Sequence, residues 1–214
     1  MKEMGDLVII SGFSGVGKGT AIASLMRKHD HYVFSVSATT RKPRPGESDG
    51  KDYFFLSREG FEQLIREERL LEYTSYQGNY YGTPRDYVDL KRNEGLDVIL
   101  DIEVEGALNV KRRYPDALLI YLIPPSAGIL ADRLRNRGTE SEEQICGRLQ
   151  RAAQEAELIG RYDAVVVNDR LEDCVEDLHR IIQQPELALR YRQDNLPLAE
   201  QIRCNLKTMT EKGE

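Results

Sequence analysis

Gly12-Phe13-Ser14-Gly15-Val16-Gly17-Lys18-Gly19-Thr20 follows directly on the apolar run from Leu7 to Ile10. The stretch predicts a phosphate-binding loop between a buried strand and a helix. Its glycines allow a tight turn that brings backbone N–H groups close to an anion, Lys18 supplies a mobile positive charge, and the following helix directs its positive end to the same place. We therefore expect nucleotide phosphates to contact Ser14, Gly15, Val16, Gly17, Lys18, Gly19 and Thr20.

One position departs from the usual form of this loop, in which Ser or Thr follows the lysine and binds magnesium. Here Gly19 follows Lys18, and Thr20 comes one place later. The alternative interpretation is a glycine-rich turn that joins a strand to a helix and binds nothing. Such a turn has no need of a lysine together with three glycines, so phosphate binding is favoured.

The composition argues against several classes of protein. The 214 residues carry a net charge of −6 with a pI near 5.3, whereas a protein that binds polynucleotides is usually basic. The N-terminus does not resemble a signal peptide, and the longest apolar run, Ala117 to Ile123, is too short to span a bilayer. The cysteines and histidines show no metal-ligand spacing. We expect a cytoplasmic protein with no nucleic-acid or membrane partner and no protein-ligated metal.

Short apolar runs alternate with helical patterns along most of the chain. The runs are Leu7 to Ile10, Val98 to Ile102, Ala117 to Ile123 and Ala164 to Val167. The alternation predicts an α/β fold, a parallel sheet with helices on both faces that binds ligands beyond the carboxyl ends of its strands. The predicted phosphate-loop core comprises residues 1–36, 87–126 and 151–214.

Two insertions interrupt this pattern. Between residues 37 and 86, aromatic and polar residues alternate and turn formers cluster, which predicts a small mixed α+β subdomain with one helix over Glu59 to Arg69. Residues 127–150 contain four arginines and no lysine, and this composition predicts a mobile helical lid.

The buried run from Val98 ends in two acidic residues, Asp101 and Glu103. Residues two apart on a strand share a face, so both carboxylates can point into one cleft. A strand-end acid near a phosphate loop orders magnesium, directly or through water. An ion pair of Asp101 with Lys18 or an arginine, made for structure alone, is the alternative.

Arg41 and Arg44 lie three residues apart in a segment that two prolines keep from forming an ordinary helix. Two guanidinium groups held close together suit a phosphate dianion, and the hydroxyls of Tyr53 and Tyr81 can complete a phosphate cage. For the arginines alone, a solvated basic turn is the alternative interpretation.

The order of several motifs resembles that of the guanylate kinase family from Leu7 to about Ile182. The matching strings are Phe34-Ser35-Val36-Ser37, Thr39-Thr40-Arg41, Pro43-Arg44-Pro45-Gly46-Glu47, Asp52-Tyr53, Gly78-Asn79-Tyr80-Tyr81-Gly82-Thr83, Leu100-Asp101-Ile102 and Val167-Asn168-Asp169. The resemblance implies in-line transfer of the γ-phosphate of ATP to GMP, and to dGMP, with magnesium as cofactor, giving ADP and GDP.

The resemblance also implies roles for individual residues. Arg41, Arg44, Tyr53 and Tyr81 would hold the acceptor phosphate, and Ser37, Glu72 and Thr83 would read guanine, with Asp101 and Glu103 in the same cleft. The implied catalytic residues are Lys18, Arg41 and the lid arginines Arg133, Arg137 and Arg148, while Asn168 would lie near the adenine of ATP. Thr20 and Asp101 would hold magnesium through water. Arg135 and Arg151 are interpreted as surface residues paired with the glutamates at 140, 142 and 143.

Three positions depart from the family pattern. Gly19 replaces the usual Ser, Glu103 stands where Asp is usual, and Glu105 stands where Gln is frequent. The Gly-Lys-Gly-Thr form is similar to that of adenylate kinases, where water can complete the metal shell. We expect retained activity with a weaker affinity for magnesium.

Other functions compete with this interpretation. Gly19-Thr20 suggests a kinase that prefers AMP, but adenine would present an acceptor to the Glu72 carboxylate and leave it unpaired. A non-catalytic guanylate-kinase-like interaction module is a second alternative, and Lys18 argues against it. A phosphate-loop GTPase lacks support because the chain has no Asn-Lys-x-Asp motif. The sequence is compatible with a monomer or a homodimer.

Overall fold

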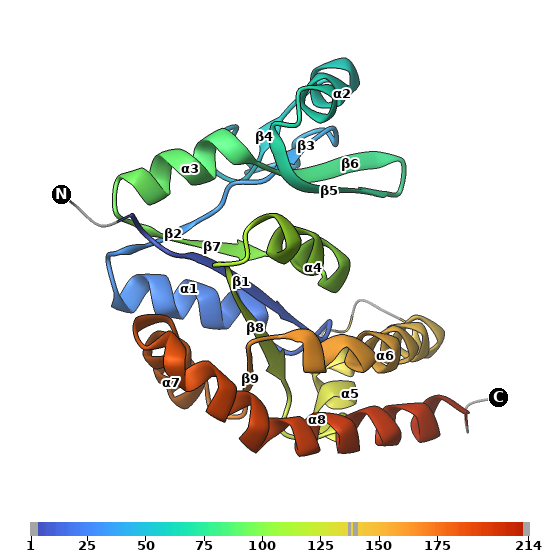
Figure 1. The fold of residues 1–214 in the computed structure, drawn as a ribbon. Coiled ribbons are helices and arrows are strands. Elements are labelled where there is room, and N and C mark those ends of the chain that lie inside the picture. Colours follow the sequence, from blue (N-terminus) through green and yellow to red (C-terminus); the bar gives the residue numbers. More distant parts are fainter. Residues whose placement is uncertain (1–3, 137, 139–140, 212–214) are drawn as a thin grey trace. The chain divides into compact units, whose positions relative to one another are not determined.

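The computed structural model describes residues 4–136, 138 and 141–211, and these residues form two sheets and eight α-helices (Figure 1). The first sheet contains β1 (Leu7–Gly12), β2 (Tyr32–Phe34), β7 (Asp97–Asp101), β8 (Leu118–Ile123) and β9 (Ala164–Val167), in the order β2-β7-β1-β8-β9. The second contains β3 (Ala38–Thr39), β4 (Phe54–Phe55), β5 (Leu70–Tyr76) and β6 (Asn79–Pro84), in the order β4-β3-β6-β5.

The helices separate the strands along the chain. They are α1 (Lys18–Lys28), α2 (Arg58–Arg66), α3 (Arg85–Asn93), α4 (Val104–Arg113), α5 (Ala127–Arg135), α6 (Glu142–Glu155), α7 (Leu171–Gln183) and α8 (Ala188–Glu211). Short 3-10 helices, η1 (Ala156–Arg161) and η2 (Pro185–Leu187), follow α6 and α7. The chain divides into two compact units, Met1–Val8 with Asp30–Ala117 and Ile9–His29 with Leu118–Glu214.

In the first sheet, β2 pairs with β7 in one unit and β8 pairs with β9 in the other, and both pairs are parallel. Tyr32 pairs with Asp97 where β2 meets β7, and Ile120 pairs with Ala164 where β8 meets β9. All six residues of β8 are buried, and successive side chains of a strand point to opposite faces, so both faces of this strand are covered. The predicted α/β fold with a parallel sheet is therefore confirmed, and the four apolar runs correspond to β1, β7, β8 and β9.

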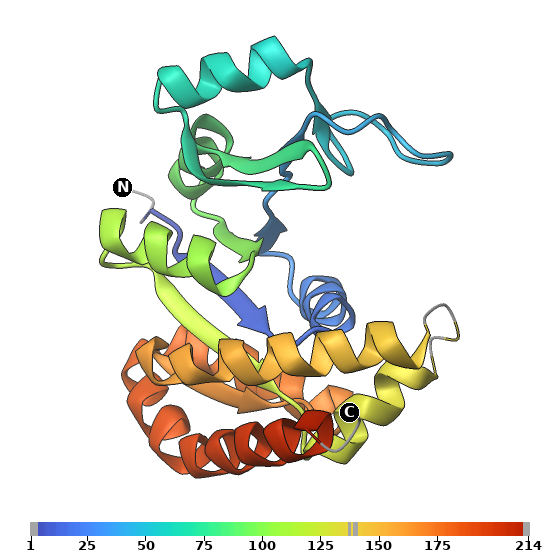
Figure 2. The same cartoon turned by 90° about the vertical axis from the view of Figure 1, so that its right-hand side faces the viewer.

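Helices of the second unit pack against β9 and against one another. Helix α8 contacts β9 and α6, and α6 and α8 run alongside each other in Figures 1 and 2. The buried residues Ala199, Ile202 and Leu206 of α8 recur every three or four positions, as expected for one apolar face of a helix. This packing closes the core beside the strand that leads to Asn168.

The four-stranded sheet lies within residues 38–84 and has its own apolar cluster, built around Ala38, Phe61 and Leu70. Phe61 belongs to α2, and its ring stacks on Tyr80 of β6 at 5.2 Å between centroids. The tight turn between β5 and β6 places Gln77 and Gly78 at φ 49° and 78°, the left-handed pair of a two-residue hairpin. The residues predicted to form a mixed α+β insertion thus contain both a sheet and a helix, and their division from the core stays a prediction.

Helix α2 differs from its expected bounds. It begins at Arg58, after Ser57, whose side chain accepts a hydrogen bond from the Gly60 amide, and it ends at Arg66 rather than at Arg69. Glu68 adopts φ 53°, in the left-handed region, and the Arg69 amide donates to the Leu64 carbonyl at 2.9 Å. The chain thus leaves the helix through a left-handed residue, a termination that glycine usually marks and that the sequence therefore conceals.

The predicted lid range 127–150 contains α5 and most of α6. Ser141 caps α6 through a reciprocal capping box with Gln144, and the helix continues to Glu155, past the predicted boundary. Movement of this range and the three-part division of the chain stay predictions. Among the residues that the structure describes, no helix is long and apolar enough to cross a membrane.

Leu119 tests the packing of β8. Its side chain is 0% exposed, so Leu119→Ala should leave a cavity and lower the free energy of unfolding by about 2 to 5 kcal/mol. Leu189 is 50% exposed, and Leu189→Ala should change it by less than about 0.5 kcal/mol. Urea unfolding followed by circular dichroism measures both values. Equal losses in the two variants would contradict the placement of β8 in the core.

Candidate active site

The loop between β1 and α1 has a backbone that requires glycine at three places. Gly15 and Gly17 adopt φ 91° and 96°, values that residues other than glycine rarely adopt. Gly12 has an ordinary φ, but a Cβ there would lie 2.7 Å from the Leu122 carbonyl oxygen. The loop is closed by a hydrogen bond of 3.0 Å from the Val16 amide to the Phe13 carbonyl. Its shape therefore depends on three glycines that the sequence motif contains.

The loop leads into the N-terminus of α1, where Gly17 is the N-cap residue and no side chain caps the helix. The first amides of a helix have no partner within it, so an uncapped N-terminus attracts an anion. The Lys18 ammonium donates to the Gly12 carbonyl at 3.4 Å, a long hydrogen bond that holds the side chain back along the loop. This arrangement is suited to binding phosphate.

Gly19 lies in the first turn of α1, and no atom is within 4 Å of the position that a Cβ would occupy there. Thr20, the next residue, is exposed. The departure from the usual loop sequence is therefore not caused by crowding. Open space at Gly19 can accommodate either a hydroxyl or a water molecule.

Hydrogen bonds to the Val16 carbonyl connect the loop to Arg133 of α5 and to Asn168, the residue after β9. It accepts hydrogen bonds from Arg133 Nη1 at 3.0 Å and from Asn168 Nδ2 at 2.8 Å. Arg133 Nη1 also donates to the Asn168 carbonyl at 3.0 Å. Arg133 and Asn168, both predicted site residues, thus contact the phosphate loop and each other.

The remaining arginines near residues 127–150 behave differently from one another. Arg148 Nη1 donates to Ser14 Oγ at 3.2 Å, so this side chain reaches the phosphate loop. Arg135 pairs with Glu142 at 3.1 Å, as expected for a surface residue, and Arg151 pairs with Glu155, a different glutamate from those expected. Arg137 lies outside the described residues.

The other unit contains a cavity of about 280 Å³, near the lower end of the range for ligand pockets. Six predicted site residues line it: Ser37, Tyr53, Glu72, Tyr81, Asp101 and Glu103. They come from the four-stranded sheet and its flanking segments, from the end of β7 and from the residues before α4. Residues far apart in the sequence therefore form one pocket within this unit.

Glu72 is the most buried carboxylate of this cavity. Its Oε1 accepts a hydrogen bond of 2.7 Å from Thr83 Oγ1, and a Cβ on Gly106 of α4 would lie 3.2 Å from its Oε2. Burial raises the pKa of Glu72 above its ordinary value, and the nearby charge of Glu103 raises it further. Thr83 is fully buried, so it acts on the cavity through Glu72 and is absent from the wall itself.

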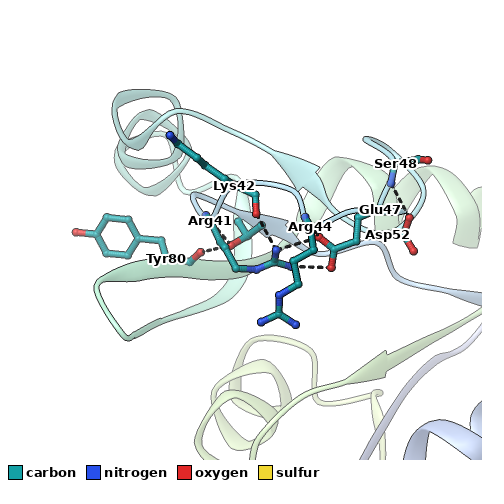
Figure 3. A network of polar contacts seen from close by, with 8 residues as sticks. Arg41, Lys42, Arg44, Glu47, Ser48, Asp52 and Tyr80 are labelled. Atoms are coloured by element: carbon teal, nitrogen blue, oxygen red, sulfur yellow. Dashed lines mark hydrogen bonds and ion pairs between the residues drawn. The ribbon is translucent and has the colours of Figure 1, made fainter.

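Arg41 and Arg44 lie in the loop after β3, and Glu47 binds both (Figure 3). Nη1 and Nη2 of Arg41 each donate to one Glu47 oxygen at 2.9 Å, and the Arg44 amide donates to Glu47 Oε2 at 2.7 Å. The hydrogen bond from Arg41 lowers the pKa of Glu47 to about 2, so this carboxylate is ionised at any physiological pH. The Arg41 guanidinium lies 5.3 Å from the centre of the Tyr53 ring, beside the cavity wall.

Sequence reasoning missed several residues of the cavity. Tyr73, Thr74 and Tyr76 line it from β5, and Asn109 lines it from α4 together with Glu105. Asn109 is four positions after Glu105, so both lie on one helix face, and this spacing was the available signal. Tyr73 and Tyr76 carry no comparable signal. They are three positions apart on β5, and the pairing of β5 with β6 shifts register between Leu70 and Tyr73, so alternation along the strand does not pick them out.

The glycine-dependent loop at the start of α1 and the parallel sheet define a protein of the phosphate-loop α/β class. A family model for guanylate kinase matches residues 4–185. The guanylate kinase of Streptococcus thermophilus strain CNRZ 1066 is 52% identical over 184 residues, covering 86% of this chain and 88% of that protein. That of Lactococcus lactis subsp. lactis strain IL1403 is 48% identical over 196 residues, covering 92% and 94%.

A solved structure agrees with the sequence comparisons. The crystal structure of guanylate kinase from Anaplasma phagocytophilum superposes with a TM-score of 0.66 at 30% identity, covering 86% of this chain and 87% of that one. The chain belongs to the guanylate kinase family.

Gly17 and Gly19 differ in how much space is available for the methyl group of an alanine. Gly17→Ala should lower the free energy of unfolding by about 1 to 3 kcal/mol and weaken ATP binding, because alanine is strained at φ 96° and its Cβ would lie 2.8 Å from Asn168 Nδ2. Gly19→Ala, in open space within the helix, should keep the stability or raise it by up to about 1 kcal/mol. Thermal unfolding with and without ATP compares them. A stable Gly17→Ala variant with normal ATP binding would refute this account of the loop.

Proposed function

We propose that this chain transfers the γ-phosphate of ATP to GMP, and to dGMP, producing ADP and GDP. The observation that carries the proposal is the buried Glu72 carboxylate, held by Thr83 in a cavity beside the Arg41 and Tyr53 side chains. The relatives that are about 50% identical over most of the chain are named guanylate kinase, which supports the same activity. An AMP-preferring kinase and a non-catalytic module are the rival functions.

Guanine recognition is assigned to Glu72 and Ser37, which line the cavity, and to Thr83, which acts through its hydrogen bond to Glu72. The pairing edge of guanine offers two adjacent N–H donors, which an ionised carboxylate accepts, beside a carbonyl oxygen that a hydroxyl can serve. Adenine presents an acceptor at the same place, so the carboxylate would receive hydrogen bonds from Thr83 but would lack the second donor that guanine supplies. That mismatch is worth roughly a hundredfold in selectivity.

The acceptor phosphate is assigned to Arg41, Arg44, Tyr53 and Tyr81. Two guanidinium groups and two phenol hydroxyls supply donors to a dianion, and Tyr53 and Tyr81 lie edge to face with ring centres 6.2 Å apart. The second ionisation of a phosphate monoester lies at about pH 6, so its oxygen is a competent nucleophile at neutral pH. No side chain has to act as a general base.

The donor phosphates are assigned to residues 14 to 20, with Lys18 and Arg148 neutralising the charge that shifts during in-line transfer. Arg148 already contacts Ser14, which supports this role. Arg133 is bound to the Val16 and Asn168 carbonyls, so its first contribution would be to hold the loop and Asn168 in place. We assign Arg137 to the donor phosphates and Asn168 to the adenine on the family resemblance alone.

Magnesium fits the residues present if water completes its shell. The ion prefers oxygen ligands and keeps several waters, and the Thr20 hydroxyl and the open space at Gly19 are compatible with such a shell. Asp101 is assigned to magnesium, through water, on the family resemblance alone. When bound with ATP, magnesium neutralises charge on the phosphate oxygens. We further propose that the protein works in the cytoplasm, where ATP and GMP are available, as a monomer or a homodimer.

Glu72→Gln tests the assignment of the acceptor base. The amide can pair with adenine but accepts only one of the guanine donors, so the ratio of kcat/KM for GMP to that for AMP should fall by roughly a hundredfold. Initial rates with GMP, dGMP, AMP, CMP and UMP measure the preference of both proteins. Lys18→Ala should lower kcat for every acceptor and leave their order unchanged. A preference of the unaltered protein for AMP would exclude the proposed substrate, and binding of ATP and GMP without turnover would favour the interaction module.

Gly19→Ser tests how magnesium is held. Because the position has room for a side chain, the added hydroxyl should lower the magnesium concentration that gives half-maximal rate by a factor of about three to ten. Gly19→Ala is the matched control, since it adds a side chain without an oxygen, and it should not strengthen the magnesium dependence. Titration of the rate with magnesium at fixed ATP compares the proteins. An unchanged dependence in Gly19→Ser would contradict a metal site near this position.

A further inference from the structure

Glu47 is an acidic residue at the centre of a segment assigned to binding an anion. Its side chain is 20% exposed, and that of Arg41 is 15% exposed, so the pair is largely shielded from water. Around it the loop is held by further contacts, since the Glu47 amide donates to the Arg44 carbonyl at 3.0 Å and the Ser48 amide donates to Asp52 at 2.8 Å. The carboxylates of Glu47 and Asp52 thus fold the chain from Arg41 to Tyr53 back on itself (Figure 3).

The way in which Glu47 binds Arg41 leaves part of the guanidinium for another anion. A guanidinium presents five N–H donors, and carboxylates or phosphates can bind in pairs along its edges. Glu47 occupies the edge formed by Nη1 and Nη2, and the second hydrogen of Nη1 goes to the Lys42 carbonyl at 2.7 Å. The edge formed by Nε and Nη2 is not used by Glu47. The Tyr81 hydroxyl, which is assigned to the same phosphate, also interacts with this guanidinium. A second anion can therefore bind Arg41 beside Tyr81 without displacing the carboxylate of Glu47.

The second arginine of the segment is arranged in a complementary way. Only its backbone amide binds Glu47, at 2.7 Å, and in Figure 3 its guanidinium points away from that carboxylate. Tyr53, over whose ring Arg41 lies, and Tyr81 belong to the cavity wall. Glu47 thus fixes one guanidinium side chain beside the cavity and the backbone that carries the other.

We propose that Glu47 is a positioning residue for the acceptor phosphate, an internal carboxylate that orients Arg41 so that its Nε and Nη2 edge and the Arg44 guanidinium receive the phosphate together. The inference rests on the proposed function, because it concerns the same acceptor. It opposes a simple charge argument, in which a carboxylate beside two arginines competes with the phosphate and its removal tightens binding. The bidentate geometry on a different edge of Arg41 favours positioning over competition.

Glu47→Gln and Glu47→Ala test the inference by comparing a ligand that carries the phosphate with one that lacks it. Calorimetric titration of the full chain with GMP and with guanosine measures the gain in affinity that the phosphate supplies. Glu47→Gln should weaken GMP binding by about fivefold and Glu47→Ala by about tenfold, whereas guanosine binding should change by less than about twofold. The KM for GMP should rise in the same order, with the KM for ATP unchanged.

Glu62 supplies the matched control. It lies in the same insertion and pairs with Arg58 at 3.1 Å, so Glu62→Gln removes a charge and an ion pair without touching Arg41. It should leave both affinities unchanged. In an Arg41→Lys background, Glu47→Gln should have little further effect on GMP binding, because a lysine lacks the planar fork that Glu47 orients.

Several results would overturn the inference. Unchanged or tighter GMP binding in Glu47→Gln would mean that the carboxylate does not position the phosphate ligands. Equal weakening of GMP and guanosine binding would mean that Glu47 only maintains the fold of the loop, and full additivity with Arg41→Lys would mean that it does not act through Arg41. If the unaltered chain bound GMP more tightly than guanosine but did not phosphorylate it, the proposed activity would fail, and the comparison of variants would still decide the role of Glu47.

Discussion

The phosphate loop depends on one steric constraint, the close approach of its backbone to the atoms around it. Gly12 lies against the Leu122 carbonyl, and Gly15 and Gly17 have left-handed φ values at positions where a Cβ would meet Leu134 and Asn168. Because these places exclude side chains, the backbone can turn from β1 into α1 within five residues and direct the helix N-terminus at the site. Val16, at the centre of this turn, then becomes the acceptor that holds Arg133 and Asn168.

In the other unit, two carboxylates organise a region assigned to a negatively charged ligand. Glu72 is largely buried and its pKa is raised, so its charge is costly, and the hydrogen bonds from the side chain and backbone of Thr83 use only part of its capacity to accept. Glu47 is the opposite case, since its pKa is lowered by the guanidinium that it binds. One carboxylate is therefore left with unused acceptor capacity toward a base, and the other is satisfied by the protein itself. The difference follows from their hydrogen-bond partners, because both are glutamates with the same intrinsic chemistry.

Much of the fold could be predicted because its signals are local. The run from Leu118 to Ile123 is apolar at every position, which is typical of a strand covered on both faces. The glycines of the phosphate loop predict its tight turn. Where helices end is less evident from the residues. Helix α2 ends through Glu68 in a left-handed conformation that glycine usually adopts, and α6 runs on to Glu155 because nothing in the residues after 150 interrupts a helix.

The types of residue in the sequence predicted several members of the site, but they did not predict which side chains contact each other. Arg41, Glu72 and Asp101 could be chosen from the sequence because charged groups among turns and strand ends suggest ligands. Residues such as Tyr73, Tyr76 and Asn109 could not, since their positions in the cavity wall depend on how β5 and α4 pack. The roles of Glu47 as partner of Arg41, and of Thr83 as partner of Glu72, likewise emerge only when side chains are placed.

The sequence by itself determined the class of fold, the phosphate loop and the chemistry available on each side of the reaction. These features could be predicted because backbone conformation at glycine and the burial of apolar runs depend on residues that are neighbours in the sequence. Tertiary structure alone decided which donors and acceptors are already satisfied. Hydrogen bonds and desolvation act over a few ångströms in space between residues that lie from 6 to more than 100 positions apart, as in Arg41 with Glu47 and Val16 with Arg133. For that reason the sequence showed that Arg41 and Glu47 are present, and the folded chain showed how one orients the other.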